Sequence, residues 1–383
     1  MSKTGIAVFN LLFVPFLLLA EDGNPAIGIP DGCYASPEAG CVVPVGKQVR
    51  FKGLSSGNPS EWTWTLDDGE LAKISGQDAE VVFEKEGRYN VGLTIVDNGV
   101  ERMVTLDGGV LAGGTHEVWN IQYSERELMS SVPLDISWYG YYAGSNVYGD
   151  AFAEKFEKPV TNAVINGVCV YFASTVHISE EAVIEVSICP ANKYGLPSDN
   201  YMETASLPVA ELIPYDSGMP TIFEFEKPVA VDDEFFVVIS GIPCAMRGMS
   251  ADEIAILCGP DRGEEGLSTV YSHIDYENQN YWRKDSDRHL SMAVAPVISF
   301  EKGDDVQGDV FEINDNAGLK YDGNEIISDG KYECISIYDL YGNDVLKVIC
   351  PSGRIALDKL QPGIYVAVAW RDGVADVLKL MKR

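Results

Sequence analysis

Histidine, cysteine and serine side chains determine what covalent chemistry this chain could perform. The four histidines are His116, His177, His273 and His289. A serine or cysteine hydrolase needs its nucleophile beside a histidine that an acid orients. The histidines lie far apart, and none falls in a Gly-x-Ser-x-Gly, His-Glu-x-x-His or Cys-x-x-Cys setting. We therefore expect structural histidines, no catalytic residue, no metal ion and no cofactor.

Carboxylates leave one enzymatic alternative open. A glycosidase needs two suitably separated acids, and the chain has 58 Asp and Glu residues. We expect a non-catalytic protein, because no motif identifies a reaction. The alternative is a carbohydrate-active or proteolytic enzyme whose site lies in the central part of the chain.

Aromatic residues mixed with amides and acids are the best candidates for ligand contact. They are Tyr276, Tyr281 and Trp282, within 271–283, and Tyr139, Tyr142 and Tyr148 from another loop. Such mixtures suit the recognition of a sugar or a peptide. The alternative is that these rings cap the ends of a sandwich core, because large rings are rarely left fully in water.

Eight cysteines, an even number, permit disulfide bonds if the chain is exported. Residues 168–176 and 182–190 alternate like two strands around Ser179. A hairpin centred there would place Cys169 opposite Cys189 on one face. The sequence therefore predicts a Cys169–Cys189 bridge, with two buried free thiols as the alternative.

Short runs of alternating apolar and polar residues, separated by Gly, Pro, Asn and Asp, follow one another along the chain. Sustained 3.6-residue periodicity is almost absent, so an all-β fold is expected. A glycine-dense stretch at 107–114 and a polar stretch at 301–305 suit domain boundaries. The sequence thus predicts an N-terminal domain at 21–110, a central domain at 115–300 and a C-terminal domain at 306–383.

The central segment has the strand content of a jelly-roll-type β-sandwich with two sheets. Strands are expected at 134–142, 168–176, 182–189, 221–226, 234–240, 254–258, 267–273 and 290–298. Any function specific to this protein is expected in this segment.

The charge balance argues against nucleic acid as a partner. The chain has 28 basic and 58 acidic residues, which gives a net charge of −30. Such a surface repels phosphate backbones and anionic lipid. No nucleic-acid binding is expected.

The first twenty residues have the order of a signal peptide. Lys3 precedes an apolar run from Gly5 to Leu19, and Ala20 stands before the acidic Glu21. This order predicts export with cleavage after Ala20, the alternative being a buried core helix. The run is too short for a comfortable membrane span, and no later segment approaches about 20 consecutive apolar residues. We therefore expect an exported chain with no transmembrane segment in its mature form.

The segment from about 33 to 106 contains a tryptophan strand, a tight turn and a Gly-x-Tyr-x-Val strand. This pattern resembles a PKD domain. The matching residues are Trp64, Asp68, Gly69, Gly87, Tyr89, Val91 and Asp97, whereas Leu66 and Asp67 stand where phenylalanine and glycine are usual. The resemblance implies an immunoglobulin-like sandwich that serves as a spacer or binding module and has no active site. Trp64 and Tyr89 are expected in its core, because inward aromatics dominate such cores.

The last segment contains three motifs in a fixed order. They are Asp339-Leu340-Tyr341-Gly342, then Leu360-Gln361-Pro362-Gly363-Ile364-Tyr365, then the basic ending Lys379-Leu380-Met381-Lys382. This order resembles the C-terminal sorting domain of type IX secretion substrates, although Asn343 stands where a cation commonly follows the glycine. The resemblance implies the type IX secretion machinery as a partner and a place at the cell surface or outside the cell. The alternative is a small C-terminal β-sandwich without a sorting role.

Together these features predict a non-catalytic secreted or cell-surface protein. Its central module is expected to bind a glycan, or a host or other extracellular protein, between a spacer and a sorting domain. The segment from Trp138 to Gly149 is weakly similar to jelly-roll modules of other surface proteins with this sorting domain. That likeness implies no functional residue.

Overall fold

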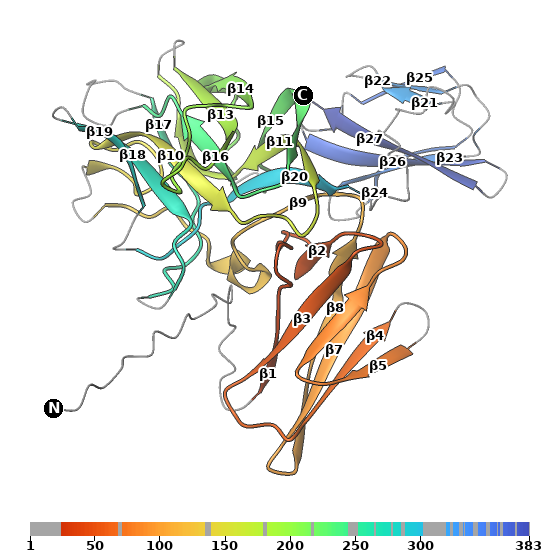
Figure 1. Ribbon diagram of the computed structural model, residues 1–383. Helices are drawn as coiled ribbons and strands as arrows, with labels where there is room; N and C mark the ends of the chain where they lie inside the picture. The colour runs from red at the N-terminus through yellow and green to blue at the C-terminus, as the bar shows by residue number, and fades with distance from the viewer. Residues whose placement is uncertain are drawn as a thin grey trace, which may run out of the picture. The chain divides into compact units, whose positions relative to one another are not determined.

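Short alternating runs of apolar and polar residues form β-strands along the described chain (Figure 1). The computed structural model describes residues 24–67, 71–134, 139–178, 182–215, 218–243, 252–263, 266–276, 279–284, 288–301, 319–321, 325–328, 332, 334–339, 344–349, 353–357, 359–360, 363–371 and 374–382. The chain divides into two compact units, Met1–Val306 and Gln307–Arg383. The predicted all-β class is confirmed, and the predicted signal peptide at 1–20 lies outside the described residues.

The first part of the larger unit is a β-sandwich. One sheet has the order β1-β3-β6 and the other the order β2-β8-β7-β4-β5. The strands are β1 (Pro25–Gly28), β2 (Cys41–Val43), β3 (Gln48–Ser55), β4 (Glu61–Asp67), β5 (Leu71–Ser75), β6 (Asp78–Val82), β7 (Gly87–Asp97) and β8 (Val100–Ala112). In β3, Val49 and Phe51 are buried whereas Gln48 and Arg50 are exposed, as the strand period of two requires.

The core of this first sandwich involves both aromatics that were expected in it, Trp64 and Tyr89. Trp64 on β4 is fully buried, with its ring centroid 6.1 Å from that of Phe51. Tyr89 on β7 is partly buried and packs on Phe83 at 4.9 Å between centroids. Core packing is thus confirmed for Trp64 and Tyr89. The expected turn at 68–69 lies outside the described residues.

The glycine-rich stretch at 107–114 is not the expected connector. Strand β8 continues through it to Ala112 and pairs with β7 and β2, while residues 107–109 bulge opposite Asn90. The bulge accommodates the glycines without ending the strand. In addition, Tyr34, Val42 and Leu111 of the first sandwich belong to the hydrophobic core of the following one. The two sandwiches therefore share a core within one unit.

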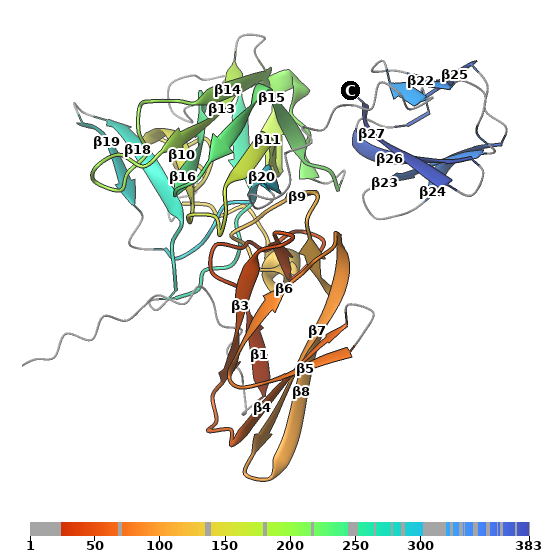
Figure 2. The same cartoon turned by 45° about the vertical axis from the view of Figure 1, so that its right-hand side comes forward.

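The central part of the unit is a second sandwich (Figure 2). Its inner faces enclose the largest hydrophobic core among the described residues. Its sheets have the orders β14-β13-β16-β10-β18-β19 and β15-β11-β20-β9, with a separate pair β12-β17. The strands are β9 (Thr115–Glu117), β10 (Gly149–Phe156), β11 (Ala163–Val170), β12 (Phe172–Val176), β13 (Val183–Pro190), β14 (Glu203–Pro208), β15 (Thr221–Val231), β16 (Phe235–Ser240), β17 (Glu253–Ile256), β18 (Val270–Tyr276), β19 (Gln279–Lys284) and β20 (Val294–Phe300). Two short 3-10 helices, η2 (Tyr123–Leu128) and η4 (Val209–Glu211), complete it.

The predicted Cys169–Cys189 bridge is wrong, because the strands that carry the two cysteines do not pair. Strand β11 lies between β15 and β20, and Cys169 is in register with Ile222 and Ala295. Strand β13 lies between β14 and β16, and Cys189 is in register with Phe236. The two cysteines therefore lie in different sheets, and the strand pairing that would place them opposite each other for a disulfide bond does not exist.

The smaller unit has a hydrophobic core of its own. One sheet contains β21 (Leu319–Tyr321), β22 (Glu325–Ser328) and β25 (Gly353–Ala356), and the other β24 (Asp344–Ile349), β23 (Cys334–Asp339), β26 (Gly363–Arg371) and β27 (Val374–Lys382). Ile335, Ile337 and Ala367 are fully buried between them. The unit is thus a small β-sandwich, and its sorting role stays a prediction.

A buried polar network holds η2 against the loops that precede β18 and β20. The guanidinium of Arg262 binds both carboxylate oxygens of Glu125, at 2.9 and 2.7 Å. It also donates to the Ser291 hydroxyl at 2.9 Å and to the carbonyls of Asn120 and Leu267 at 3.1 and 3.2 Å. A guanidinium has five N–H donors, so every donor of Arg262 has an acceptor.

Glu154 on β10 continues this network in the interior. Its side chain is fully buried and accepts hydrogen bonds from the Asn120 amide at 2.8 Å, the Met292 backbone N–H at 2.9 Å and the Thr269 hydroxyl. Burial raises the pKa of the Glu154 carboxyl to about 7, although these hydrogen bonds and the nearby Arg262 act in the opposite direction. Glu154 is therefore a titrating group inside the sandwich that carries the candidate site.

We expect Glu154 to make the protein less stable as the pH rises from about 4.5 to about 7. Its folded-state pKa lies above the ordinary value of 4.5, so the folded protein holds this proton more tightly than the unfolded chain does. The free energy of unfolding begins to fall once the Glu154 carboxyl ionises in the unfolded chain. The decrease levels off above the folded-state pKa and totals about 3 kcal/mol. The measurement is the free energy of urea unfolding from pH 4 to pH 8 for the wild-type chain and for Glu154→Gln. The value for the variant is subtracted from that for the wild type at each pH. A difference that does not change with pH would contradict the assignment.

Candidate ligand-binding site

On the outer face of the six-stranded sheet, register pairs connect Ser206, Glu185 and Ser240 and, separately, His273 and Trp282, while Asp150 joins the second group through its contact with His273. Together they are named the outer row: Ser206 (β14), Glu185 (β13), Ser240 (β16), Asp150 (β10), His273 (β18) and Trp282 (β19). Glu185 is the register partner of both Ser206 and Ser240. His273 is paired with Trp282 on one side and with Ala151, at the β10 bulge beside Asp150, on the other. Five strand spacings of roughly 4.8 Å give the row a length of about 24 Å.

Side-chain contacts connect the members of the outer row. Nδ1 of His273 lies 2.7 Å from Oδ1 of Asp150, and the imidazole centroid lies 5.1 Å from that of the Trp282 indole, at an interplanar angle of 57°. The Ser240 hydroxyl donates to Glu185 Oε2 at 3.5 Å. The Asp150 side chain is 54% exposed, so solvent and ligands can reach the middle of the row.

Tyr201 lies just before β14, the strand that carries Ser206 of the outer row. Its side chain is 46% exposed. Partial burial, then the nearby Cys189 thiol, then the carboxylates of Asp199, Glu185 and Asp150 raise the pKa of the Tyr201 phenol. The two carboxylates of the outer row, Glu185 and Asp150, thus both act on the pKa of this phenol.

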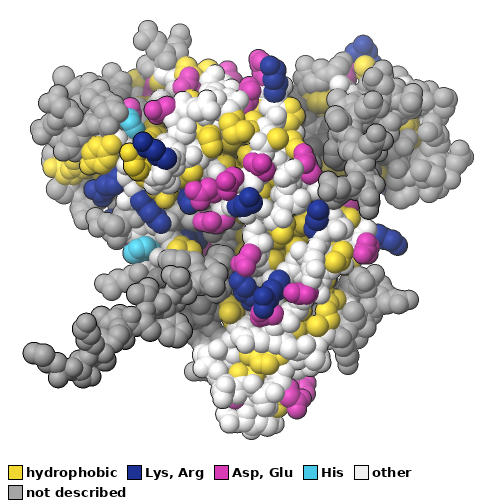
Figure 3. Space-filling view, viewed as in Figure 1, with side chains coloured by type: hydrophobic (Ala, Val, Ile, Leu, Met, Phe, Trp, Pro, Cys, Tyr) yellow, Lys and Arg dark blue, Asp and Glu magenta, His cyan; other side chains and the backbone are white. Residues whose placement is uncertain are grey.

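An apolar cluster beside the row orients Trp282. It contains Ala153, Cys189, Phe236, Val238 and Tyr271, and Leu196 and Trp282 pack against it. The indole is thus partly buried on one side and accessible on the other. Hydrophobic and basic side chains gather over β18 and β19, at the left of Figure 3. A rigidly held aromatic ring with an accessible surface is a typical anchor for a ligand.

Of the predicted contact residues, only Trp282 lies in the outer row. Tyr281, 46% exposed, precedes it on β19 and is in register with Ile274, so it points to the opposite face. Tyr276 ends β18, and its side chain lies outside the described ones. The predicted surface of Tyr276, Tyr281 and Trp282 is therefore not one platform.

The tyrosines of the other predicted loop have two different environments. Tyr139 and Tyr148 form an edge-to-face pair with centroids 5.7 Å apart, and Tyr148 is 42% exposed. Tyr142 is 5% exposed and belongs to the sandwich core, and the Arg288 guanidinium lies over its ring at 5.7 Å. The core alternative is correct for Tyr142, because its backbone turns the ring inward beneath β17. Asp150, Glu185, Ser206 and Ser240 are the members of the site that the sequence did not indicate, and His273 lies in the indicated stretch 271–283 but was expected to be structural.

Three histidines outside the row have structural contacts. His116 Nε2 lies 2.8 Å from the Gly113 carbonyl, and His177 lies 3.6 Å from the buried Asp252 carboxylate. The backbone N–H of His289 donates to Asp261. Among the described residues, no group of three or more His, Cys, Asp or Glu side chains could hold a metal ion.

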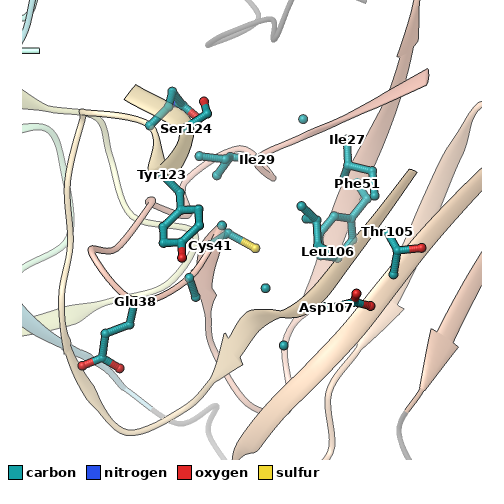
Figure 4. Close-up of a pocket in the computed structure, with 16 residues that line it drawn as sticks. Ile27, Ile29, Glu38, Cys41, Phe51, Thr105, Leu106, Asp107, Tyr123 and Ser124 are labelled. Carbon is teal, nitrogen blue, oxygen red and sulfur yellow. The ribbon is translucent and has the colours of Figure 1, made fainter. Parts of the chain in front are cut away.

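A separate cavity of about 240 Å³ lies between the first sandwich and η2 (Figure 4). Its lining is mainly apolar, with Ile27, Ile29 and Leu106 among its members and the Cys41 sulfur turned inward. One acidic lining residue, Glu38, pairs with Arg88 at 3.5 Å. None of the residues predicted to contact a ligand lines this cavity.

Comparisons with known proteins support the assignment of the first sandwich. Its two-sheet architecture is immunoglobulin-like, and residues 36–106 match the family model of the PKD domain, which confirms the resemblance for this part of the chain.

A solved structure described as "Structural basis for the promiscuous specificity of the carbohydrate-binding modules from the beta-sandwich super family" is 12% identical to this chain. The alignment covers 74% of this chain and 100% of that chain with a TM-score of 0.19, which is too low to carry an argument. No curated protein matches the chain.

In the part of the chain that the structure describes, no helix has the length and apolar character needed to cross a bilayer.

Proposed function

We propose that this chain is an exported, non-catalytic binding protein whose central module holds a glycan along the outer row. The observation that carries the proposal is the alignment of the partly exposed Trp282 indole with the His273–Asp150 pair on one sheet face. A sugar ring has apolar C–H faces and a rim of hydroxyl groups. The indole suits the faces, and carboxylate and imidazole groups suit the hydroxyls.

Charge favours a neutral glycan over an anionic one. The row contains two carboxylates, Asp150 and Glu185, on a chain with a net charge of −30. This field repels sulfated or uronic acid-rich polymers. An extended site about 24 Å long, from strand spacing, suits several sugar units better than a monosaccharide. A host or other extracellular protein is the second class of ligand.

The rest of the chain supports a role outside the cell. The order of residues 1–20 supports export, and the motifs of 339–382 support recognition by the type IX secretion machinery. The PKD domain would then act as a spacer next to the ligand-binding sandwich. Localisation at the cell surface or in the medium follows from these proposals.

A carbohydrate-active or proteolytic enzyme in the same sandwich has less support. Glu154 is the carboxylate whose pKa is raised to about 7, as a general acid would require. However, its side chain is fully buried and already accepts three hydrogen bonds. It therefore cannot reach a bound substrate.

Replacing Trp282 with alanine is expected to weaken glycan binding at least about thirtyfold, because an aromatic anchor contributes roughly 2 kcal/mol or more. The full chain would be screened on an array of neutral glucans, mannans and xylans together with peptides, and the bound probe would be titrated. The matched control is Tyr281→Ala, one residue away on the opposite face, which is expected to change the affinity less than twofold.

Stability measurements make this test decisive. Trp282 is only partly buried, so its truncation is expected to reduce the free energy of unfolding by about 1–2 kcal/mol, less than the loss for a core ring. Equal affinity losses for both variants would remove Trp282 from the site. If the chain bound peptides but no glycan, the ligand class would be a protein instead of a glycan.

A further inference from the structure

A short hairpin at 33–43 lies between the two sandwiches of the larger unit. Tyr34 and Val42 are paired in it, and the Val42 N–H donates to the Tyr34 carbonyl at 2.8 Å. The side chains of both belong to the core of the central sandwich. Cys33 and Cys41, each one residue earlier, belong to the core of the first sandwich. The two thiols thus lie on the same face of the hairpin.

The register makes Cys33 and Cys41 diagonal neighbours. Cys33 lies opposite Val43 if the pairing of Tyr34 with Val42 continues, and Cys41 is two residues before Val43. The right-handed twist of a two-stranded ribbon brings one diagonal of such a pair closer than the other. Both side chains belong to the same buried hydrophobic cluster, where they are free thiols in the structure.

Other contacts hold the hairpin in one conformation. The Ser36 hydroxyl accepts hydrogen bonds from the N–H groups of Glu38 and Ala39, at 3.1 and 2.8 Å. Gly32, just before Cys33, has φ +72°, and a Cβ there would lie 2.4 Å from the Val160 nitrogen. A constrained loop favours bond formation between two cysteines at its ends.

We propose that Cys33 and Cys41 form a disulfide bond when the exported chain folds in an oxidising compartment. The oxidant is a protein or small-molecule disulfide. A thiolate of the pair attacks one sulfur of that disulfide and releases a thiol, and the second cysteine then attacks the mixed disulfide and releases the other. The two cysteines lose two protons and two electrons, and the disulfide of the oxidant is reduced to two thiol groups.

Burial determines when this exchange is possible. Only the thiolate attacks a disulfide. Burial raises the pKa of the Cys41 thiol to about 12, and burial together with Cys41 raises that of Cys33 well above its ordinary value. The bond therefore forms during folding, before the thiols are enclosed, whereas a chain folded under reducing conditions oxidises slowly.

Peptide mapping tests the bond directly on the full chain secreted under oxidising conditions. The chain is alkylated in denaturant without reduction and cleaved after glutamate, because Glu38 separates the two cysteines while no Lys or Arg does. We expect the peptide that ends at Glu38 to be joined to the one that begins at Ala39. Cys189 and Cys258, buried apart from the hairpin, are expected to carry the alkyl group.

Two single variants complete the test. In Cys33→Ser and Cys41→Ser the remaining hairpin cysteine is expected to become alkylated, and the melting temperature to fall by about 5 °C. Full alkylation of both cysteines in the secreted wild-type chain, or a link from either to another cysteine, would overturn the proposal. The peptide map of the wild-type chain tests the disulfide bond even if neither variant folds. Its result does not depend on whether the chain binds a glycan.

Discussion

Replacing Trp64 with alanine is expected to lower the free energy of unfolding by about 4 kcal/mol, the typical loss for a large aromatic removed from a core. The Trp64 side chain is fully buried between the two sheets of the first sandwich, against Phe51. Its indole N–H also donates to the Gly76 carbonyl at 3.1 Å, which is left without this donor in the variant. Urea unfolding of the full chain, followed by circular dichroism, measures the loss.

Trp62 is the matched control for this substitution. It lies two residues away on the same strand but is only partly buried at the margin of the same core. Trp62→Ala is therefore expected to reduce the free energy of unfolding by about 1–2 kcal/mol, since the loss increases with the apolar contact removed. If the two variants lost the same amount, Trp64 would not be the centre of this core.

Replacing Arg262 with methionine is expected to lower the free energy of unfolding by about 4 kcal/mol. Methionine retains an unbranched apolar chain but removes five hydrogen bonds and leaves the Glu125 carboxylate without its ion partner. Arg262 and Glu125 have side-chain exposures of only 4% and 13%, so water cannot replace the lost contacts. The measurement is again urea unfolding, at pH 7.

An exposed ion pair of the same unit provides the comparison. Arg50 binds Asp78 at 2.6 Å, but the two side chains are 59% and 27% exposed. Arg50→Met is expected to change the free energy of unfolding by less than about 1 kcal/mol, as surface pairs generally do. In the double variant Arg262→Met with Glu125→Leu, part of the loss should return, because no unpaired buried charge remains. Additive losses would mean that the two side chains do not act as a pair.

Alternation and turn residues were enough to predict the fold class, and the resemblance to a PKD domain predicted the first sandwich. The spacing of Trp64, Gly87 and Tyr89 reflects a local pattern of strand, turn and core aromatic, and local patterns are readable from the sequence. Strand partners were not readable. Alternation gives the faces of 168–176 and 182–190, but β12 pairs with β17 and β13 with β14 and β16. The choice among partners depends on packing between distant segments.

The candidate site illustrates the same limit. Trp282 was indicated by composition, because aromatics among amides and acids are typical of recognition surfaces. Asp150 and His273 join it only through the order of β10, β18 and β19, which brings together residues more than a hundred positions apart. The grouping of Tyr281 with Trp282 was avoidable, since adjacent residues of a strand point to opposite faces.

The shared core of the two sandwiches has a mechanical consequence. Tyr34, Val42 and Leu111 extend from the first sandwich into the interior of the second, and strand β8 ends only two residues before Gly114 and β9. Swivelling at this junction would expose these apolar side chains to water, at a loss of roughly 2 kcal/mol for each one. The PKD domain is therefore held rigidly against the second sandwich and does not move independently of it. A tensile load applied to it would be transmitted first to the β15-β11-β20-β9 sheet, because β9 belongs to that sheet and not to the one that bears the outer row.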